Sequence, residues 1–146
     1  ILSAKPKSRG TNITGALQFI HNTLKKRCVC FVLSDFLDDK YESALKVLAR
    51  QHDCIGIHCW DALERDLPDV GVLRVADAET GAQTWVDTTS YRLRRQYTQT
   101  FEAHLSNTQN MFRRAGADFL SLSTNQPYVQ ALLQFFSRRS KTVTHG

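Results

Sequence analysis

Hydrophobic residues occur in two kinds of segment that follow one another along the chain. In one kind they have helical spacing, and in the other they form short unbroken runs. Apolar residues repeated every three or four positions predict one face of a helix, and short runs rich in β-branched residues predict strands that are covered on both faces. The helical spacing predicts helices over residues 11–27, 40–51 and 90–114, and a last helix from Pro127 that is anchored by Leu132, Leu133 and Phe136. The apolar runs predict strands over residues 28–33, 54–60 and 119–122.

The segment between the second predicted strand and the third predicted helix departs from both patterns. Residues 72–76 and 83–86 flank a turn that contains Gly81. This arrangement is typical of a β-hairpin, because glycine adopts the positive φ of the turn. The rest of the chain alternates helices and strands, and this order predicts an α/β fold: an open parallel sheet with helices on both faces, plus a β-hairpin insertion.

A chain of 146 residues fits one domain. The polar and basic residues 1–10 predict an extended lead-in, residues 11–137 the folded domain, and residues 138–146 a polar tail. The first residue is Ile1 instead of methionine, so we expect a piece of a longer protein, with any membrane anchor upstream of it. No apolar run approaches the ~18 residues that cross a bilayer. We therefore expect a cytoplasmic location and no membrane contact from this segment.

The charge balance permits an acidic partner but does not define one. The net charge is +5 and the isoelectric point is near 9.2, but most basic residues fall within predicted helices. Nucleic-acid binding needs basic residues gathered on one face, with base-reading side chains among them. No motif of that kind is present, and we expect no nucleic-acid contact.

The four cysteines, Cys28, Cys30, Cys54 and Cys59, lack the C-x-x-C spacing of a zinc or redox site. We interpret them as buried, reduced cysteines of a cytosolic protein.

Catalytic motifs are scarce in the sequence. It has no G-x-S-x-G nucleophile elbow, no phosphate-binding P-loop and no G-x-G-x-x-G. His52 follows a predicted helix and His58 lies within a predicted strand, and we interpret both as satisfied structural histidines. We therefore expect no enzymatic activity.

Two acidic residues stand where parallel strands are predicted to end, Asp35 after the first strand and Asp61 after the second. Ligands of open α/β sheets bind at this edge. Ser34 lies beside Asp35, and Thr11, at the start of the first helix, should reach the same edge. Their oxygens suit Mg²⁺, whereas helix or turn capping is the structural alternative for Thr11 and both acids. Glu64, in the loop after Asp61, is open to the same two interpretations.

Several short segments, taken in order, resemble a known family. Residues 9–17, Arg-Gly-Thr-Asn-Ile-Thr-Gly-Ala-Leu, are similar to the G-T-N-x-x-x-A-L segment of von Willebrand A domains, and Leu33-Ser34-Asp35-Phe36 is similar to their later metal-site strand. The downstream chain resembles the bacterial von Willebrand A-like family known as domain of unknown function fifty-eight, whose members are often encoded beside MoxR-type AAA+ ATPases. The segments that carry this second resemblance are Arg50-Gln51-His52-Asp53, Asp61 with Glu64, Leu67-Pro68, Asp77-Ala78-Glu79-Thr80-Gly81 and Phe135-Phe136-Ser137-Arg138-Arg139.

The resemblance implies a metal-ion-dependent adhesion site, which takes five side chains from three segments. By this resemblance Thr11 corresponds to the loop threonine and Asp35 to the later aspartate. The D-x-S-x-S motif that supplies the other three ligands is absent from the chain. Thr11 and Asp35 would then form a partial remnant site, with Ser34, Asp61 and Glu64 as accessory candidates. The resemblance implies Mg²⁺ or Mn²⁺ in the full-length protein, and no tightly bound metal in this chain.

The family's strand order also implies that the strand at residues 28–34 pairs with a strand from the upstream segment. In this chain that apolar strand becomes a sheet edge that neither charge nor proline protects. We therefore expect the chain to form a homo-oligomer through this edge.

The resemblance favours a protein-interaction module of von Willebrand A type, acting with a MoxR-like AAA+ ATPase in the assembly or maturation of protein complexes. One alternative is a Rossmann-like metal-dependent phosphate hydrolase that uses Asp35 and Asp61. A second alternative is a basic nucleic-acid-binding domain.

Overall fold

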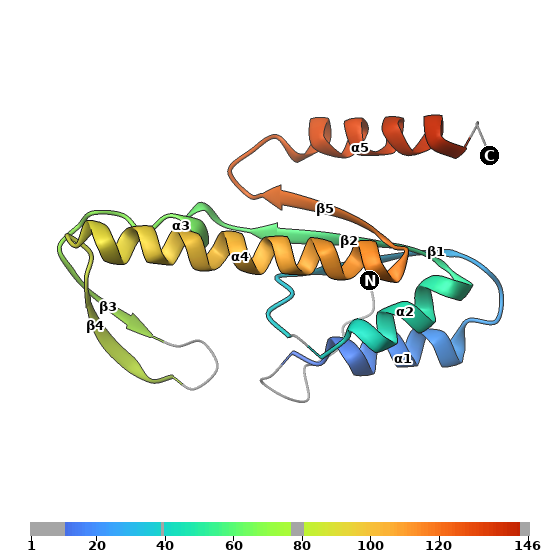
Figure 1. Cartoon of the computed structure of the whole chain (residues 1–146), viewed down its shortest axis with the longest axis horizontal. Helices are drawn as coiled ribbons and strands as arrows, with labels where there is room; N and C mark the ends of the chain where they lie inside the picture. Colours follow the sequence, from blue (N-terminus) through green and yellow to red (C-terminus); the bar gives the residue numbers. More distant parts are fainter. Residues whose placement is uncertain (1–10, 39, 77–80, 144–146) are drawn as a thin grey trace.

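The computed structural model describes residues 11–38, 40–76 and 81–143 (Figure 1). A parallel sheet has the strand order β1-β2-β5, where β1 is Val29–Ser34, β2 is Asp53–Trp60 and β5 is Asp118–Ser123. An antiparallel hairpin contains β3 (Val72–Ala76) and β4 (Gln83–Asp87). The helices are α1 (Ile13–Thr23), α2 (Glu42–Gln51), α3 (Ala62–Arg65), α4 (Tyr91–Ala115) and α5 (Tyr128–Val143).

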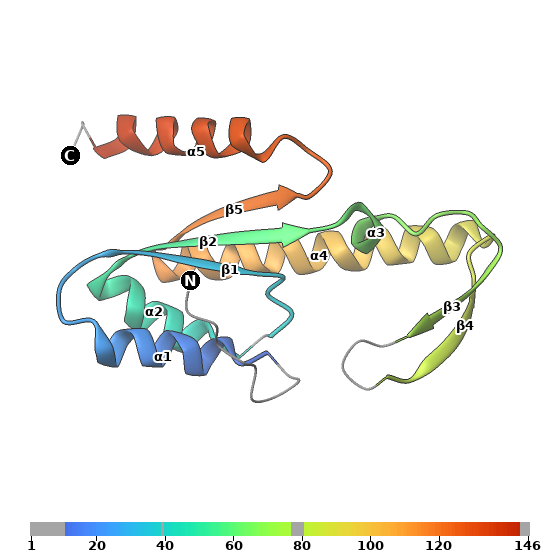
Figure 2. The same ribbon diagram turned by 180° about the vertical axis from the view of Figure 1, so that it is seen from behind.

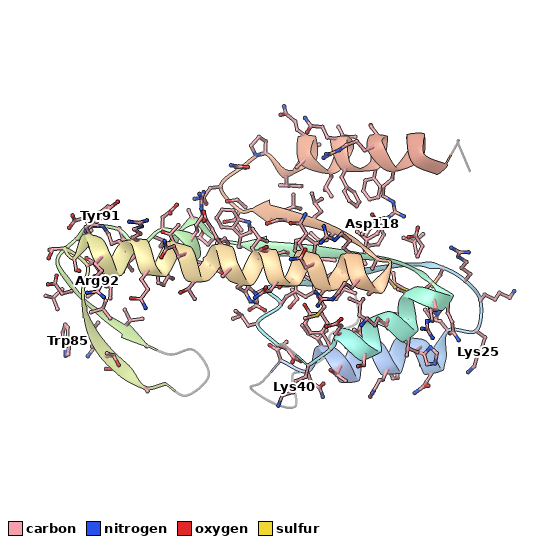
Figure 3. All side chains as sticks on the ribbon, in the orientation of Figure 1. Lys25, Lys40, Trp85, Tyr91, Arg92 and Asp118 are labelled. Carbon is pink, nitrogen blue, oxygen red and sulfur yellow. The ribbon has the colours of Figure 1, made fainter. Side chains whose placement is uncertain are left out.

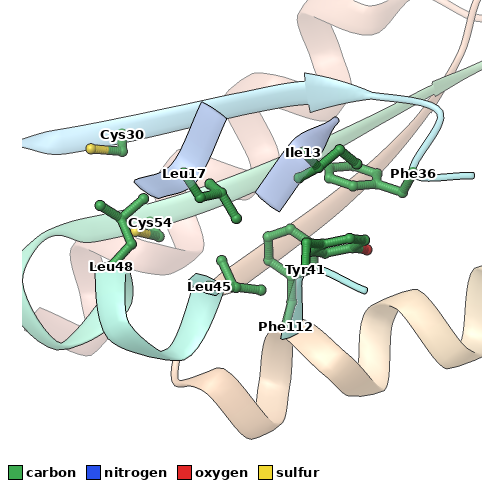
Figure 4. Close-up of a cluster of buried hydrophobic side chains, with 9 residues drawn as sticks. All are labelled: Ile13, Leu17, Cys30, Phe36, Tyr41, Leu45, Leu48, Cys54 and Phe112. Atoms are coloured by element: carbon green, nitrogen blue, oxygen red, sulfur yellow. The ribbon is translucent and has the colours of Figure 1, made fainter. Parts of the chain in front are cut away.

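Helices cover both faces of the three-stranded sheet, which confirms the predicted α/β architecture (Figures 1 and 2). On one face α1, α2 and α4 enclose the larger core, part of which Figure 4 shows. On the other face α5 packs through Leu132 and Phe135 against Ile55 and Ile57 of β2. Side chains alternate between the faces along a strand, so β2 is buried on both sides, as its unbroken apolar sequence predicts. The larger core consists of Ile13, Leu17, Cys30, Phe36, Tyr41, Leu45, Leu48, Cys54 and Phe112.

The last helix is longer than the sequence predicts. Composition predicts a polar tail from residue 138, but α5 continues to Val143. Arg139, within the expected tail, places Nη2 2.7 Å from both carboxylate oxygens of Asp53 and Nη1 3.2 Å from an oxygen of Asp118. These contacts attach the end of α5 to β2 and β5. Tertiary ion pairs thus stabilise helical structure in a segment whose own sequence is polar.

The residues that anchor α5 also differ from those predicted. Phe135 is only 9% exposed, whereas Leu133 is 63% and Phe136 41% exposed. The prediction that Leu133 and Phe136 are anchors is therefore wrong, because α5 lies over β2 and β5 and turns a different apolar stripe toward the sheet.

The predicted hairpin is confirmed, and it stands away from the sheet beside the N-terminal part of α4 (Figure 2). Most of its predicted turn, residues 77–80, lies outside the described residues. Thr88 fixes the base of the hairpin, since its hydroxyl donates to the Gly71 carbonyl at 2.6 Å and accepts from the Val70 amide at 3.1 Å. Trp85 is exposed on β4 (Figure 3).

β1 forms one edge of the sheet, because among the described residues its only strand partner is β2. Val29, Phe31 and Leu33 are in register with Asp53, Ile55 and Ile57 and so point to the face that carries α5. The helix covers them only in part, through a contact of Phe136 with Phe31, and they are 53%, 47% and 64% exposed. We call Val29, Phe31 and Leu33 the β1 apolar face.

Candidate functional site

The carboxyl ends of the three parallel strands meet at one edge of the sheet, as the sequence predicts for Asp35 and Asp61. Ser34 ends β1, Trp60 ends β2 and Ser123 ends β5. The amide of Thr124 donates to the Trp60 carbonyl at 2.9 Å, so the pairing of β2 and β5 continues up to this edge.

Asp35 lies in a tight turn that begins at Ser34. The Ser34 hydroxyl lies 3.2 Å from Oδ1 of Asp35, and the same hydroxyl accepts from the Phe36 amide at 3.0 Å. Oδ1 of Asp35 also accepts from the Leu37 amide at 3.3 Å. The predicted neighbours Ser34 and Asp35 therefore do interact, and a backbone turn orients their side chains.

Phe36 anchors this turn in the core. Its φ of 55° lies in the left-handed region, which costs an L-residue with a bulky side chain strain energy. The ring is fully buried, and its centroid lies 5.2 Å from that of Phe112 and 5.8 Å from that of Tyr41. Burial of the ring offsets the backbone strain and fixes where Asp35 emerges from β1.

The start of α1 contacts the same loop. Asn12 caps the helix, with Oδ1 accepting from the Gly15 amide at 2.7 Å, and the Ile13 amide donates to Oδ2 of Asp38 at 3.3 Å. Thr11 is exposed immediately before this cap. The structure therefore joins the segments of Thr11 and Asp35 through Asp38, a residue that sequence reasoning missed. The metal-ligand roles of Thr11 and Asp35 stay predictions.

Asp61 and Glu64 come together in a helix cap. Oδ1 of Asp61 accepts from the Leu63 amide at 2.9 Å, while a carboxylate oxygen of Glu64 accepts from the Asp61 amide at 2.9 Å. The other oxygen of Asp61 accepts from the Thr124 hydroxyl at 2.9 Å. Hydrogen bonds from Leu63 and then Thr124 hold the pKa of Asp61 below its ordinary value. This capping box begins α3, a helix that the sequence did not predict.

A buried histidine of β2, His58, lies close to these strand ends. Nδ1 of His58 lies 3.3 Å from the Ser121 hydroxyl, which also accepts from the Trp60 indole at 2.9 Å. Burial lowers the pKa of His58, and the nearby His104 lowers it further, so this histidine is neutral at pH 7. Nε2 of His104 lies 3.3 Å from the backbone carbonyl of Asp35. The interpretation of His58 as a structural histidine agrees with these contacts.

Clusters of three or more His, Cys, Asp or Glu side chains able to share one metal ion occur at one place in the described part of the chain. That place is Cys28, Cys30 and His52, near the amino ends of β1 and β2, and it includes neither Asp35 nor Asp61. Sequence spacing missed it, because the ligands are separated by one and by twenty-one residues instead of the two of C-x-x-C.

The fold and the strand-end site define an α/β protein with an open parallel sheet. A family model described as protein of unknown function DUF58 matches residues 1–107, and the chain belongs to this family. It is 26% identical to an uncharacterized protein of Mycobacterium avium, over 92% of this chain and 80% of that protein. It is also 26% identical to uncharacterized proteins of Mycobacterium bovis and Mycobacterium tuberculosis, over 90% of this chain but only 41% of their length.

No solved structure matches the chain at a significant level. Within the described residues, none of the helices combines the length and the apolar character that a membrane span requires.

Proposed function

We propose that this chain is part of a protein-interaction module of von Willebrand A type, not an enzyme. The observation that carries the proposal is the β1 apolar face. Phe31 and Leu33 expose 47% and 64% of their surface beside a strand edge that no other strand pairs with in the described part of the chain. Edge strands usually carry charge, proline or a covering element that prevents further pairing, and β1 carries neither charge nor proline. A surface of this kind gains free energy when a partner covers it.

The helix beside this face extends the same surface. Phe136 of α5 meets Phe31 edge to face, with the ring centroids 6.2 Å apart, and Leu133 is exposed on the same helix. The partner would therefore cover both a strand edge and apolar side chains of α5. A second copy of the chain supplies such a surface by two-fold symmetry. The resemblance to von Willebrand A-like proteins points to a MoxR-type AAA+ ATPase as the physiological partner.

Leu33→Lys places a charge on the β1 apolar face and is expected to abolish concentration-dependent self-association in sedimentation velocity. The matched control is Val72→Lys, which changes a similarly exposed valine on the hairpin. The same two variants are then titrated against a purified MoxR-type ATPase, where we expect weaker binding for Leu33→Lys alone. A wild-type chain that stays monomeric and does not bind the ATPase would contradict the proposal, as would equal losses in both variants.

The remnant metal site is the second part of the proposal. A longer protein that includes the upstream segment is expected to bind Mg²⁺ or Mn²⁺, and Asp35→Ala is expected to weaken that binding and the metal-dependent binding of the ATPase. Asp66→Ala, which changes an exposed aspartate outside the site, is the control. Isothermal titration calorimetry measures both effects. If Asp35→Ala binds metal and partner as tightly as the control variant does, Asp35 has no role in the site.

A further inference from the structure

At the amino ends of the strands, opposite the predicted adhesion site, two cysteines and a histidine gather. Cys28 lies just before β1, Cys30 lies on β1, and His52 lies between α2 and β2. The Asp53 amide donates to the Cys28 carbonyl at 2.9 Å, which fixes the two chain segments against each other. Three potential ligands therefore come from segments whose backbones are already joined.

The distances between the ligand atoms are close to those around a single zinc ion. Sγ of Cys28 lies 3.6 Å from Sγ of Cys30 and 3.3 Å from Nδ1 of His52, and the three atoms all lie within 4.8 Å of one another. Tetrahedral Zn²⁺ with bonds of ~2.3 Å to sulfur and ~2.0 Å to nitrogen separates its ligand atoms by about 3.5–3.8 Å. Only small side-chain movements are needed to place an ion among them.

His52 is buried without the full set of partners that a structural histidine needs. It is 3% exposed, and its Nε2 is buried with no hydrogen-bond partner among the described residues. The polar contact that its ring does make is with Cys28. His52 is also the C-terminal cap of α2, where the partial negative charge of the helix end favours a cation. This arrangement differs from the satisfied structural histidine that the sequence predicts.

We propose that Cys28, Cys30 and His52 bind one Zn²⁺ ion, with Cys54 or a water molecule as the fourth ligand. Cys54 is in register with Cys30 on the neighbouring strand, and Figure 4 shows both side chains beside Leu48. The ion would connect the segment that enters β1 to the turn between α2 and β2. With Cys54 as the fourth ligand all four ligands would come from the protein, which is the arrangement of structural zinc sites.

The alternative use of these cysteines, as reactive thiols, fits the surroundings less well. Burial raises the pKa of Cys30 to about 12 and that of Cys54 to about 11, so neither is a thiolate nucleophile at neutral pH without a metal. A bound zinc ion deprotonates the thiols that coordinate it.

A surface cavity of about 380 Å³ reaches His52, one of the three ligands, and offers the ion a path to it. The cavity is also lined by His21, whose Nδ1 is buried without a partner among the described residues. Lys25, Lys26 and Arg27 line it as well.

The test uses the chain after chelator treatment, reduced with a phosphine and then titrated with Zn²⁺ alone. We expect one equivalent to bind and the unfolding temperature to rise. Co²⁺ in place of Zn²⁺ should give thiolate-to-cobalt charge-transfer absorption and the strong visible bands of tetrahedral coordination. Cys28→Ser and His52→Gln should each weaken Zn²⁺ binding more than about tenfold, since even changes to residues behind metal ligands cost 10- to 100-fold.

The matched control is Cys59→Ser, which changes the exposed cysteine on the opposite face of the sheet and should bind Zn²⁺ like the wild type. Far-ultraviolet circular dichroism without metal verifies that each variant is folded. Cys28 is only half-buried, so of the two ligand variants we expect Cys28→Ser to disturb folding less. Absence of Zn²⁺ binding in the wild type would overturn the proposal, and so would unchanged affinity in folded Cys28→Ser and His52→Gln.

Discussion

Phe36→Ala is expected to lower the free energy of unfolding by about 3–5 kcal/mol, the usual cost when a buried phenylalanine is truncated to alanine. The ring is completely buried among Tyr41, Phe112 and other aromatic side chains, so its removal leaves a cavity in the larger core. Alanine keeps the strain of the positive φ at this position without the burial that offsets it. Urea denaturation at neutral pH measures the change.

The neighbouring Leu37 supplies the control, because it is 70% exposed and sits in the same loop. Leu37→Ala should change stability by less than about 0.5 kcal/mol. If the two variants have similar stability, Phe36 does not anchor the turn that carries Asp35.

Gly56→Ala is expected to lower the free energy of unfolding by about 3 kcal/mol, at the upper end of the usual cost of overpacking. A Cβ atom at Gly56 would lie 2.4 Å from two ring carbons of Phe112. Phe112 cannot easily move away, because its ring is fully buried against Phe36 and Phe119. β2 therefore requires glycine here for the close approach of α4, and thermal or urea denaturation reports the loss.

A double-mutant cycle separates this clash from a general intolerance of side chains in β2. Phe112→Leu removes the two ring carbons that the new methyl group would meet. The double variant Gly56→Ala with Phe112→Leu should be more stable than the sum of the single changes predicts, by about 1–2 kcal/mol. Strict additivity would mean that the cost at Gly56 arises from the strand and not from Phe112.

The sequence predicts the regular elements well, because their apolar residues repeat along a single segment. β2, for example, is an unbroken apolar run that both faces of the sheet bury. Phe36 and Arg139 follow no such repeat. Phe36 is a core residue in a turn, and Arg139 keeps the end of α5 helical through Asp53 and Asp118, which are far away in sequence. Local spacing carries no signal for contacts of this kind.

Of the two candidate sites, one could be located from the sequence and the other could not. Asp35 and Asp61 could be located from sequence, because parallel strands expose their carboxyl ends at one edge. Residue spacing could not decide whether Asp61 caps a helix or binds a metal. In the structure one of its oxygens accepts from the Leu63 amide of α3 and the other from the Thr124 hydroxyl. The Cys28, Cys30 and His52 cluster was not predicted, because His52 reaches the cysteines only through the pairing of β1 with β2.

The hairpin that stands away from the sheet carries one of the two tryptophans of the chain. Trp85 on β4 is 70% exposed, whereas Trp60, at the end of β2, is partly buried and its indole donates to the Ser121 hydroxyl. The two indoles therefore differ in solvent contact and should emit fluorescence at different wavelengths. In a Trp85→Phe chain the remaining emission reports on β2 alone, and in a Trp60→Phe chain it reports on the hairpin alone. Whether the hairpin opens before the sheet can thus be measured optically, without any added label.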